Sequence, residues 1–330
     1  MEAAEAALSA ALSAALGLGR FPSPVRASMR AAMTEPAPQD RLRLAVQKSG
    51  RLADDSFDLL ARCGLKVRRS RTELYARVAA LPIDILLVRD DDIPGLVARG
   101  ASDVGIVGGN VFEEAQLAGD ASGAATLRPL GFSRCRLCIA VPKDEVYDGP
   151  QGLADRSVAT SYPEITQRWS AEVGAALRTV TMSGAVEIAP RLGLADAICD
   201  IVSTGATLDA NGLRVAETIY ESEALLIGPD APLSPAKQRV LDALSARIDG
   251  VLRSRDAKYV MMNAPRSAID GIRAVLPGAD APTVLSLAGE GDLVGLHVLT
   301  TDAVLWEHLE EVKALGARSV LVLDVDKMLA

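Results

Sequence analysis

Short apolar runs alternate with segments of helical periodicity over most of the chain. Apolar and other side chains alternate over residues 42–46, which predicts a strand. A turn at 48–51 then leads into a helix that we expect to end at Gly64, because glycine readily adopts the left-handed conformation of a C-cap. Similar runs predict buried strands at 83–88, 104–107, 136–141, 157–160, 197–202 and 224–227. Strands separated by helices of this length are typical of a largely parallel sheet flanked by helices.

The order of elements changes after a long helix that we expect over residues 234–256. Ser234 is a suitable N-cap, Pro235 is a suitable first-turn residue, and apolar side chains line one face of the helix. The remaining pattern is strand, helix, strand, strand, helix, strand, over residues 259–262, 265–276, 283–287, 294–299, 304–315 and 320–325. This βαββαβ order predicts a separate ferredoxin-like domain of about 75 residues.

Residues 1–40 have a different character from the rest of the chain. They are rich in Ala and Ser, and the early acids Glu2 and Glu5 argue against both a signal peptide and a transit peptide. We expect a disordered or loosely helical extension, or a start upstream of the true one at Met29 or Met33. Its removal is expected to leave the chemistry unchanged.

Composition and charge exclude several classes of protein. The chain has 35 Lys and Arg against 43 Asp and Glu, a net charge of −8, and only 3% aromatic residues. A general nucleic-acid binder needs a basic face and stacking residues, so that class is disfavoured. Two histidines exclude a metal site built mainly from imidazole. Four cysteines in 330 residues favour a reducing compartment, the cytoplasm, and no apolar run beyond the alanine-rich start is long enough to span a membrane.

Cys135 and Cys138 form a Cys-x-x-Cys pair within a predicted strand. Residues i and i+3 of a strand point to opposite faces, which suits neither a chelate nor a dithiol. We therefore expect buried structural cysteines. The glycine-rich fingerprints of dinucleotide-binding and P-loop proteins do not occur.

The strongest local signal lies where the strand at 197–202 ends. Its acid, Asp200, is followed by a segment that we call the phosphate loop: Ser203, Thr204, Gly205, Ala206 and Thr207. Backbone N–H groups at the start of the next helix, together with these hydroxyls, suit a phosphate dianion, and glycine allows a close approach. Asp200 could accept hydrogen bonds from ribose hydroxyls or lie near magnesium. Taken alone, Ser203 or Thr204 could simply cap the helix.

Other candidate residues come from three turns. Lys48 and Arg51 follow the first strand, where positive charge could face phosphates or stay solvated. Arg89 opens an Arg-Asp-Asp-Asp run, which is usual in a solvated loop or at a helix start. Glu187 lies in a helix that we expect to begin at Ser183, whose amides are potential anion donors.

Together these segments are more specific than any one of them. They are QKSGRL at 47–52, RDDDIP at 89–94, TSYP at 160–163, SGAVE at 183–187, ADAICD at 195–200 and STGATL at 203–208. In this order they closely resemble the long form of ATP phosphoribosyltransferase, the first enzyme of histidine biosynthesis. The resemblance covers about residues 41–330, including KYVMM at 258–262 and ALGA at 314–317, and does not include residues 1–40.

The resemblance implies an α/β fold with a two-lobed catalytic region of the periplasmic-binding-protein type (type II), followed by the ferredoxin-like βαββαβ domain. The expected division is catalytic lobe I at 41–135 and 222–256, catalytic lobe II with the phosphate loop at 136–221, and a regulatory domain at 257–330.

The implied reaction joins N1 of the adenine of ATP to C1 of phosphoribosyl pyrophosphate and releases pyrophosphate with inversion. Magnesium (Mg2+) would travel with the pyrophosphate, because it keeps waters and prefers phosphate oxygens, and its protein ligands stay unassigned. The resemblance places the 5-phosphate on residues 203–207 and the ribose on Asp200. The sequence identifies no residue as a general base. The residues expected to line the cleft for ATP or pyrophosphate are Lys48, Gly50, Arg51, Arg89 and Glu187.

Regulation is expected in the C-terminal domain. Exposed sheet edges and apolar strands at 259–262 and 283–287 favour pairing between subunits, and the resemblance implies a homo-oligomer, from dimer to hexamer. We expect histidine to inhibit by binding at a subunit interface, with Asn263 and Thr283 as contacts. A domain that only assembles the oligomer is the alternative.

Two other functions fit the same fold. One is a non-catalytic solute-binding module, since fold alone does not fix function. The other is an inactive regulatory paralogue. A convincing signal peptide is lacking and the cleft residues named above are present, so both are less favoured than the enzyme.

Overall fold

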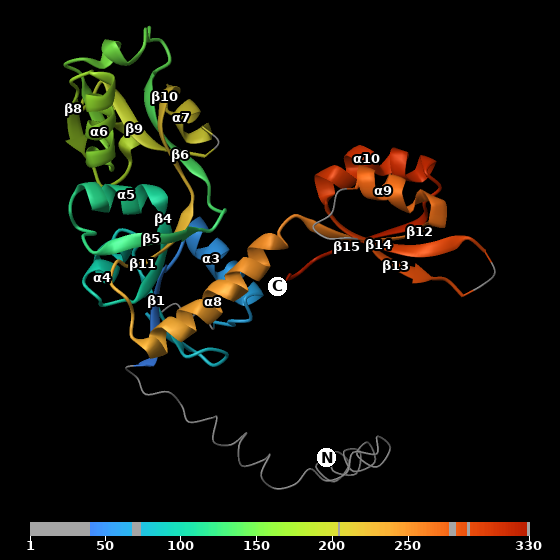
Figure 1. The fold of residues 1–330 in the computed structure, drawn as a ribbon. Coiled ribbons are helices and arrows are strands. Elements are labelled where there is room, and N and C mark those ends of the chain that lie inside the picture. The colour runs from blue at the N-terminus through green and yellow to red at the C-terminus, as the bar shows by residue number, and fades with distance from the viewer. Residues whose placement is uncertain (1–39, 68–73, 204, 277–281, 289–290, 329–330) are drawn as a thin grey trace, which may run out of the picture. The chain divides into compact units, whose positions relative to one another are not determined.

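In the computed structural model of the chain (Figure 1), the described residues are 40–67, 74–203, 205–276, 282–288 and 291–328. The chain divides into two units, of which the second is Arg41–Ala330. The expected N-terminal extension, apart from Asp40, therefore lies outside the described residues. The described strands of the second unit form three sheets.

The first sheet is mixed. Its strands are, in spatial order, β2 (Tyr75–Val78), β3 (Ile83–Val88), β1 (Leu42–Gln47), β4 (Val104–Gly108), β11 (Ala224–Pro229) and β5 (Ala124–Pro129). β1 runs parallel to β3 and β4, whereas β2, β11 and β5 pair antiparallel with their neighbours. The prediction of a largely parallel sheet is therefore wrong. The reason is that β11 enters only after the chain has built a second sheet, and it returns in the opposite direction against β4.

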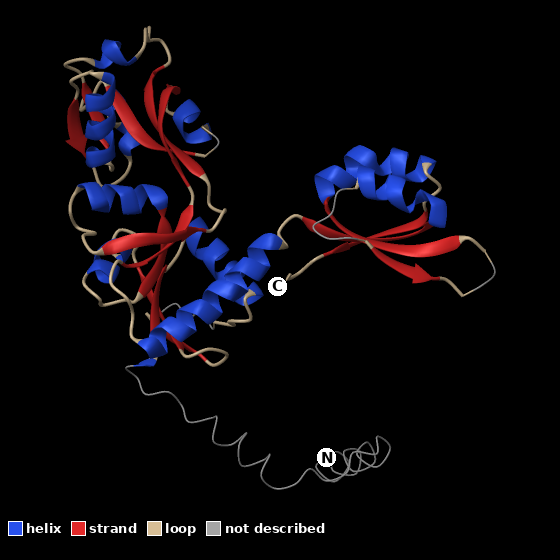
Figure 2. Cartoon of the chain, in the orientation of Figure 1, coloured by secondary structure: helices blue, strands red, loops and turns tan. Residues whose placement is uncertain are grey.

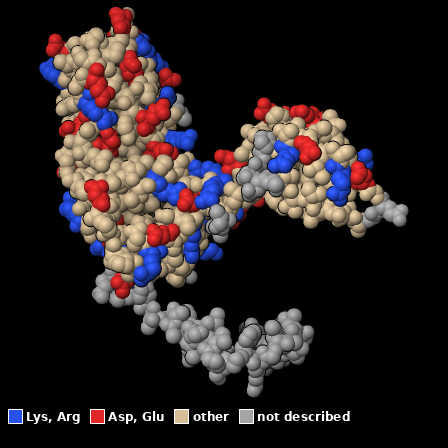
Figure 3. All heavy atoms as spheres, in the orientation of Figure 1, with Lys and Arg blue, Asp and Glu red and all other residues tan. Residues whose placement is uncertain are grey.

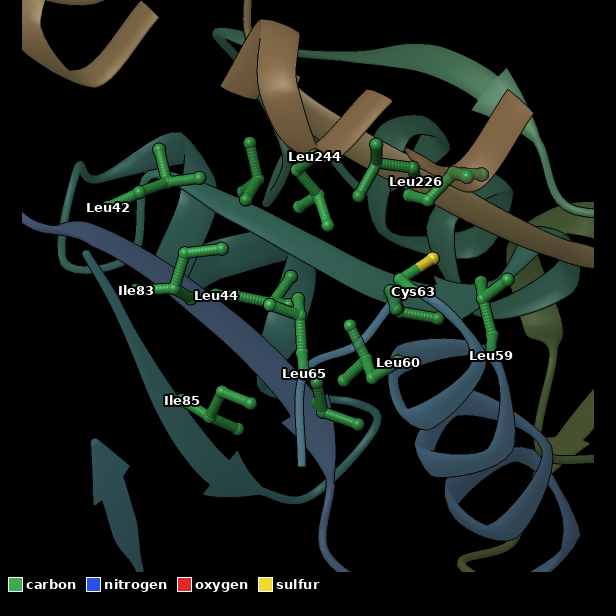
Figure 4. Close-up of a cluster of buried hydrophobic side chains, with 14 of the residues drawn as sticks. Leu42, Leu44, Leu59, Leu60, Cys63, Leu65, Ile83, Ile85, Leu226 and Leu244 are labelled. Carbon is green, nitrogen blue, oxygen red and sulfur yellow. The ribbon is translucent and has the colours of Figure 1, made fainter. Parts of the chain in front are cut away.

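Both faces of the first sheet are covered by helices. α3 (Arg51–Arg62) and α8 (Pro235–Arg253) pack on one face, and α4 (Ile93–Ala98) and α5 (Gly109–Leu117) pack on the other. Burial on both faces explains the nearly continuous apolar sequence of the central strands. Figure 4 shows the first of these two cores, in which side chains of three strands meet those of α3 and α8: Leu42, Leu44, Leu59, Leu60, Ile83, Ile85, Leu226 and Leu244.

A buried ion cluster fastens α8 to the first sheet. Lys237 Nζ donates to Asp103 Oδ1 at 2.8 Å, and Arg43 Nη2 donates to the same oxygen at 3.1 Å. The Asp103 side chain is 6% exposed. Burial raises the pKa of Asp103, but hydrogen bonds from Arg43 and Lys237 outweigh burial and hold that pKa below its usual value. Asp103 therefore stays ionised and stabilises the fold near neutral pH.

Asp103→Asn is expected to lower the free energy of unfolding by about 3 kcal/mol, because two cations lose a buried partner. The folded pKa of Asp103 is depressed, so its contribution is complete above about pH 4 and is lost as the pH falls through the folded pKa. Urea unfolding at pH 7 measures the difference. Asp242→Asn on the exposed side of α8 is the matched control, with an expected change of about 0.5 kcal/mol or less. Equal effects of the two substitutions would show that the ion cluster around Asp103 does not stabilise the fold.

The second sheet is also mixed. Its strands are, in spatial order, β10 (Leu213–Ser222), β6 (Cys135–Pro142), β9 (Ala197–Val202), β7 (Ser157–Thr160) and β8 (Arg178–Thr181). β7 is parallel to β8 and β9, and β6 is antiparallel to β9 and β10. Its helices are α6 (Pro163–Val173) and the short α7 (Ala206–Ala210), with single 3-10 turns at Pro150–Leu153, Val186–Ile188 and Pro190–Leu192.

We call the first sheet with α3, α4, α5 and α8 lobe I, and the second sheet with α6 and α7 lobe II. The strands of lobe I come from both sides of lobe II in the sequence. The residue boundaries expected for the two lobes stay a prediction.

The third sheet forms the C-terminal domain with two helices on one face (Figure 2). Its elements are β12 (Ala257–Pro265), a 3-10 turn (Arg266–Ala268), α9 (Ile269–Val275), β13 (Thr283–Ser286), β14 (Leu293–Thr301), α10 (Asp302–Ala314) and β15 (Arg318–Asp324). The antiparallel order β13, β14, β12, β15 is that of the ferredoxin-like unit.

The prediction that the segment 259–262 forms a sheet edge of this domain is wrong. The segment 259–262 lies in β12, which pairs with β14 on one side and β15 on the other, so it is interior. The segment 283–287 does contain an edge strand, β13, and all four of its residues are exposed. The apolar pattern alone could not tell a central strand from an edge strand, because both alternate.

Acidic and basic side chains are mixed over the face shown in Figure 3. Within the described residues, no helix combines the length and the apolar character needed to cross a lipid bilayer.

Candidate functional site

The phosphate loop leaves lobe II at the end of β9. Ser203 and Thr207 are exposed, and Gly205 has a φ of +82°, a left-handed conformation that favours glycine. α7 begins directly after Gly205. The loop therefore presents hydroxyls and backbone amides at one exposed turn, which is suitable chemistry for a phosphate. Thr204 lies outside the described residues.

Asp200 lies half-buried on β9, shortly before the loop. Burial raises the pKa of Asp200, and the negative charge of Glu187 raises it further, against a hydrogen bond that Ile201 N donates to Asp200 Oδ1 at 2.7 Å. Asp200 and Glu187 thus belong to one acidic region. The helix expected around Glu187 is wrong. Gly184 and Ala185 have φ of +135° and +51°, so the chain makes only the 3-10 turn Val186–Ile188.

Arg51 connects lobe I with the phosphate loop, although 152 residues separate it from Ser203 in the sequence. Its Nη1 donates to Ser203 Oγ at 3.3 Å, and its Nη2 donates to Arg134 O at 3.4 Å. Gly50 precedes it at the start of α3 with a φ of +100°, a conformation that a side chain would strain. The structure therefore brings the predicted cation directly to the predicted loop.

A cavity of about 560 Å3 opens beside this contact, where the two connections between the lobes meet the end of β9. That volume is in the usual range for small-molecule sites. Its lining residues are Arg134, Cys135, Arg136, Val202, Ser203, Glu221, Ser222 and Glu223. Cys135 faces this cavity, whereas Cys138 is buried with its Sγ 3.6 Å from Thr218 Oγ1. The two cysteines lie on opposite faces, as the strand spacing predicts.

Lys48 and Arg89 lie at a second cavity of about 470 Å3 in lobe I. Both follow parallel strands, β1 and β3, so they meet at the same edge of the sheet. Arg89 pairs with Asp91 at 3.1 Å, and both side chains are exposed. The predicted cleft residues therefore form two groups, one around Arg51 and Ser203 and the other around Lys48 and Arg89.

Tyr162 is a residue of the site that sequence reasoning missed. Its hydroxyl accepts a hydrogen bond from Asn110 Nδ2 at 2.9 Å. Burial raises the pKa of Tyr162, and the charges of Asp200 and Asp90 raise it further against the Asn110 hydrogen bond. The Asn110 hydrogen bond therefore joins Tyr162 of lobe II to α5 of lobe I. The TSYP segment marked this position, but a motif does not reveal a partner on another element.

Two family models match the chain. The model of HisG, ATP phosphoribosyltransferase, matches residues 89–250, and the model of the HisG C-terminal domain matches residues 254–327. The chain belongs to the ATP phosphoribosyltransferase family. It is therefore a pentosyltransferase of histidine biosynthesis, and the resemblance drawn from the ordered segments is confirmed.

Three solved structures are similar to parts of this chain. A chain of the ATP phosphoribosyl transferase (HisG:HisZ) complex from Thermotoga maritima is 25% identical with a TM-score of 0.52, and the match covers 63% of this chain and 98% of that chain. The VFT2 domain of BvgS from Bordetella pertussis is 14% identical over 70% of this chain and 94% of that one, with a TM-score of 0.43. The arginine-bound ArgBP of T. maritima is 12% identical, and the match covers 64% of this chain and 95% of that one, with a TM-score of 0.40.

The expected fold class is confirmed. The matched chain of the Thermotoga complex shares the α/β catalytic region, and the matched C-terminal domain of this transferase is the βαββαβ unit described above.

Proposed function

We propose that this transferase joins N1 of ATP to C1 of phosphoribosyl pyrophosphate, giving phosphoribosyl-ATP and pyrophosphate with inversion at C1. The observation that carries the proposal is the contact between Arg51 and Ser203, because it places a permanent cation of lobe I on the phosphate loop of lobe II. A phosphorylated sugar held at this point would be in contact with both lobes.

The proposed roles follow from the chemistry of each group. The phosphate loop, including Thr204, binds the 5-phosphate, and Asp200 accepts hydrogen bonds from the ribose hydroxyls. Lys48, Arg51 and Arg89 offset the negative charge that develops on the departing pyrophosphate, and Glu187 lies on the acidic side of the cleft. Adenine N1 carries its own lone pair, so the attack needs no general base from the protein. Holding two substrates in one geometry supplies much of the remaining rate acceleration.

Magnesium is proposed to enter bound to phosphoribosyl pyrophosphate. Among the described residues, no group of three or more His, Cys, Asp or Glu side chains is placed to hold a metal ion. Asp200 and Glu187 offer hard oxygen donors near the phosphate loop, and Mg2+ commonly combines one or two carboxylates with phosphate oxygens and waters. When bound, the ion would neutralise the leaving group.

Histidine is proposed to inhibit through the C-terminal domain in a homo-oligomer. The sheet face opposite α9 and α10 exposes large apolar side chains, with Leu285, Leu321 and Leu323 at 47%, 53% and 44%. An apolar face of this kind favours contact with another subunit. Asn263 pairs with Gly295, and Thr283 pairs with His297, so both predicted contact residues lie on this same face. The four cysteines are free thiols, which supports the cytoplasm as the proposed compartment.

Thr207→Val is expected to weaken binding of phosphoribosyl pyrophosphate by about 10-fold to 100-fold, because a hydroxyl that donates to a charged phosphate contributes about 1.5–3 kcal/mol. Calorimetric titration of the magnesium complex of phosphoribosyl pyrophosphate measures the change. Thr179→Val on the edge strand β8 is the matched control, since its hydroxyl accepts from Gln167 Nε2 at 3.0 Å. Affinity as high as that of the control would mean that the Thr207 hydroxyl makes no hydrogen bond to the phosphate, and would contradict the proposed phosphate site.

A further inference from the structure

Helix α6 of lobe II begins without a capping side chain of its own. Its N-cap position is Tyr162, which makes no capping hydrogen bond, and Pro163 follows at the first helical position. Serine, threonine, aspartate and asparagine are the usual N-caps, because their short side chains accept from the first backbone N–H groups. The first turn of α6 must therefore find acceptors elsewhere.

Those acceptors come from the other lobe. Glu114, on α5 of lobe I, accepts hydrogen bonds from Glu164 N at 2.8 Å with Oε1 and from Ile165 N at 3.0 Å with Oε2. One carboxylate thus occupies both amide donors at the start of α6, and its charge also suits the positive end of the helix dipole. The Glu114 side chain is half-buried, and burial raises its pKa against these two hydrogen bonds.

Two more side-chain links join α5 and α6, which are neighbouring helices in Figure 1. Asn110, one turn before Glu114 on α5, donates from Nδ2 to Tyr162 Oη at 2.9 Å. Asn110 is itself held by Ser222 at the end of β10, whose Oγ donates to Asn110 Oδ1 at 2.8 Å. Glu113 forms an ion pair with Arg168 on the outer side of α6. Residues three and four apart share one face of a helix, so α5 presents all three side chains to α6.

The position of α6 matters for the site. Thr160, at the end of β7, pairs with Cys199 of the parallel strand β9, so Tyr162, which follows β7, lies toward the same end of the sheet as Asp200, the residue of β9 after Cys199. A shift of the first turn of α6 would therefore change the position of Tyr162 relative to Asp200. It would also change the distance between the lobes, and so the contact of Arg51 with Ser203.

We propose that Glu114 is a positioning residue that caps α6 across the two lobes and, with Asn110 and Glu113, holds the cleft at the width that phosphoribosyl pyrophosphate needs. We call these three residues the interlobe brace. This inference rests on the proposed function for its substrate, but the brace itself is a property of the substrate-free protein.

The test compares Glu114→Ala with Glu172→Ala in the full chain. Glu172 lies on α6 and contacts Arg168 of the same helix at 3.6 Å, so its loss removes a charge beside Arg168 but removes no contact between the lobes. Without substrate, Glu114→Ala is expected to speed hydrogen exchange at Glu164 and Ile165 by about 10-fold or more and to increase the radius of gyration in solution scattering. Calorimetric affinity for phosphoribosyl pyrophosphate is expected to fall about 10-fold, with a smaller change in kcat.

Faster exchange with an unchanged radius of gyration and an unchanged affinity would show that Glu114 only caps a helix, and would overturn the proposal. Glu113→Ala provides a second variant, in which the cap of α6 is intact and the ion pair with Arg168 is lost. Like Glu114→Ala, Glu113→Ala is expected to increase both the radius of gyration and the dissociation constant for phosphoribosyl pyrophosphate. Values equal to those of Glu172→Ala would count against the brace. If the parent protein failed to bind phosphoribosyl pyrophosphate, the proposed function would fail, while the exchange and scattering results would still decide the brace.

Discussion

Replacing Arg51 with methionine is expected to lower kcat/KM for phosphoribosyl pyrophosphate by about 100-fold or more, because a fixed cation facing the charge that develops on the departing pyrophosphate commonly contributes this much. The guanidinium is the group that reaches from α3 to the phosphate loop, with Nη1 3.3 Å from Ser203 Oγ. Arg51→Lys keeps the charge but loses the forked geometry, so it is expected to restore only part of the rate. Steady-state kinetics at saturating ATP measure both variants.

Arg62→Met is the matched control for this substitution. Arg62 lies in the last turn of the same helix and contacts Asp326 O at 3.4 Å, away from the phosphate loop. Its kcat/KM is expected to stay within about threefold of the parent, as for an ordinary surface change. If the Arg51 and Arg62 variants lost activity equally, the effect would come from α3 stability, and the contact with Ser203 would have no catalytic meaning.

Removing the C-terminal domain after residue 256 is expected to abolish inhibition by histidine while the catalytic lobes remain able to bind substrates. The reason is that the sheet face carrying Asn263 and Thr283 is lost. An inhibitor that acts through a separate site changes substrate affinity by about 5-fold to 150-fold, and this change should disappear. Initial rates with and without histidine measure the effect, and near-ultraviolet circular dichroism checks that the lobes stay folded.

A full-length double variant, Asn263→Ala with Thr283→Val, guards against a folding failure of the shortened chain. This matters because Ser254 Oγ donates to Asp326 O at 3.0 Å and Met328 N donates to Gly250 O at 3.0 Å, and truncation removes both contacts. The double variant is expected to bind histidine more weakly and to keep the parent kcat. Histidine that inhibited the parent and the truncated protein equally would be acting at the cleft, and the regulatory proposal would be wrong.

Strands that are buried on both faces were predictable from the sequence, because burial leaves a continuous apolar run. β7 and β9 occupy the predicted residues, and β1 and β3 differ by at most one residue at an end. Within the two lobes, several strands with an exposed face were not predicted. β2 and β8 are short edge strands, and β10 has two register shifts, between Val215 and Glu217 and between Thr218 and Tyr220, which break its alternation.

The site shows the same division between local and distant information. The left-handed Gly205 and the short helix after it follow from neighbouring residues, so the phosphate loop could be located from its sequence. The partners of Arg51 and Tyr162 depend on how two separate lobes meet. No periodicity encodes such contacts: the turn after the first strand and the family segments pointed to Arg51, and only the family segments pointed to Tyr162, but neither named a partner.

The most direct test of the proposed reaction is to incubate the purified chain with ATP, phosphoribosyl pyrophosphate and magnesium, and to follow both products by mass spectrometry and a pyrophosphate assay. The account predicts phosphoribosyl-ATP substituted at N1 of the adenine, formed in equal amount with pyrophosphate and abolished when magnesium is chelated. A folded protein that binds both substrates with magnesium present and yet releases no pyrophosphate would contradict it.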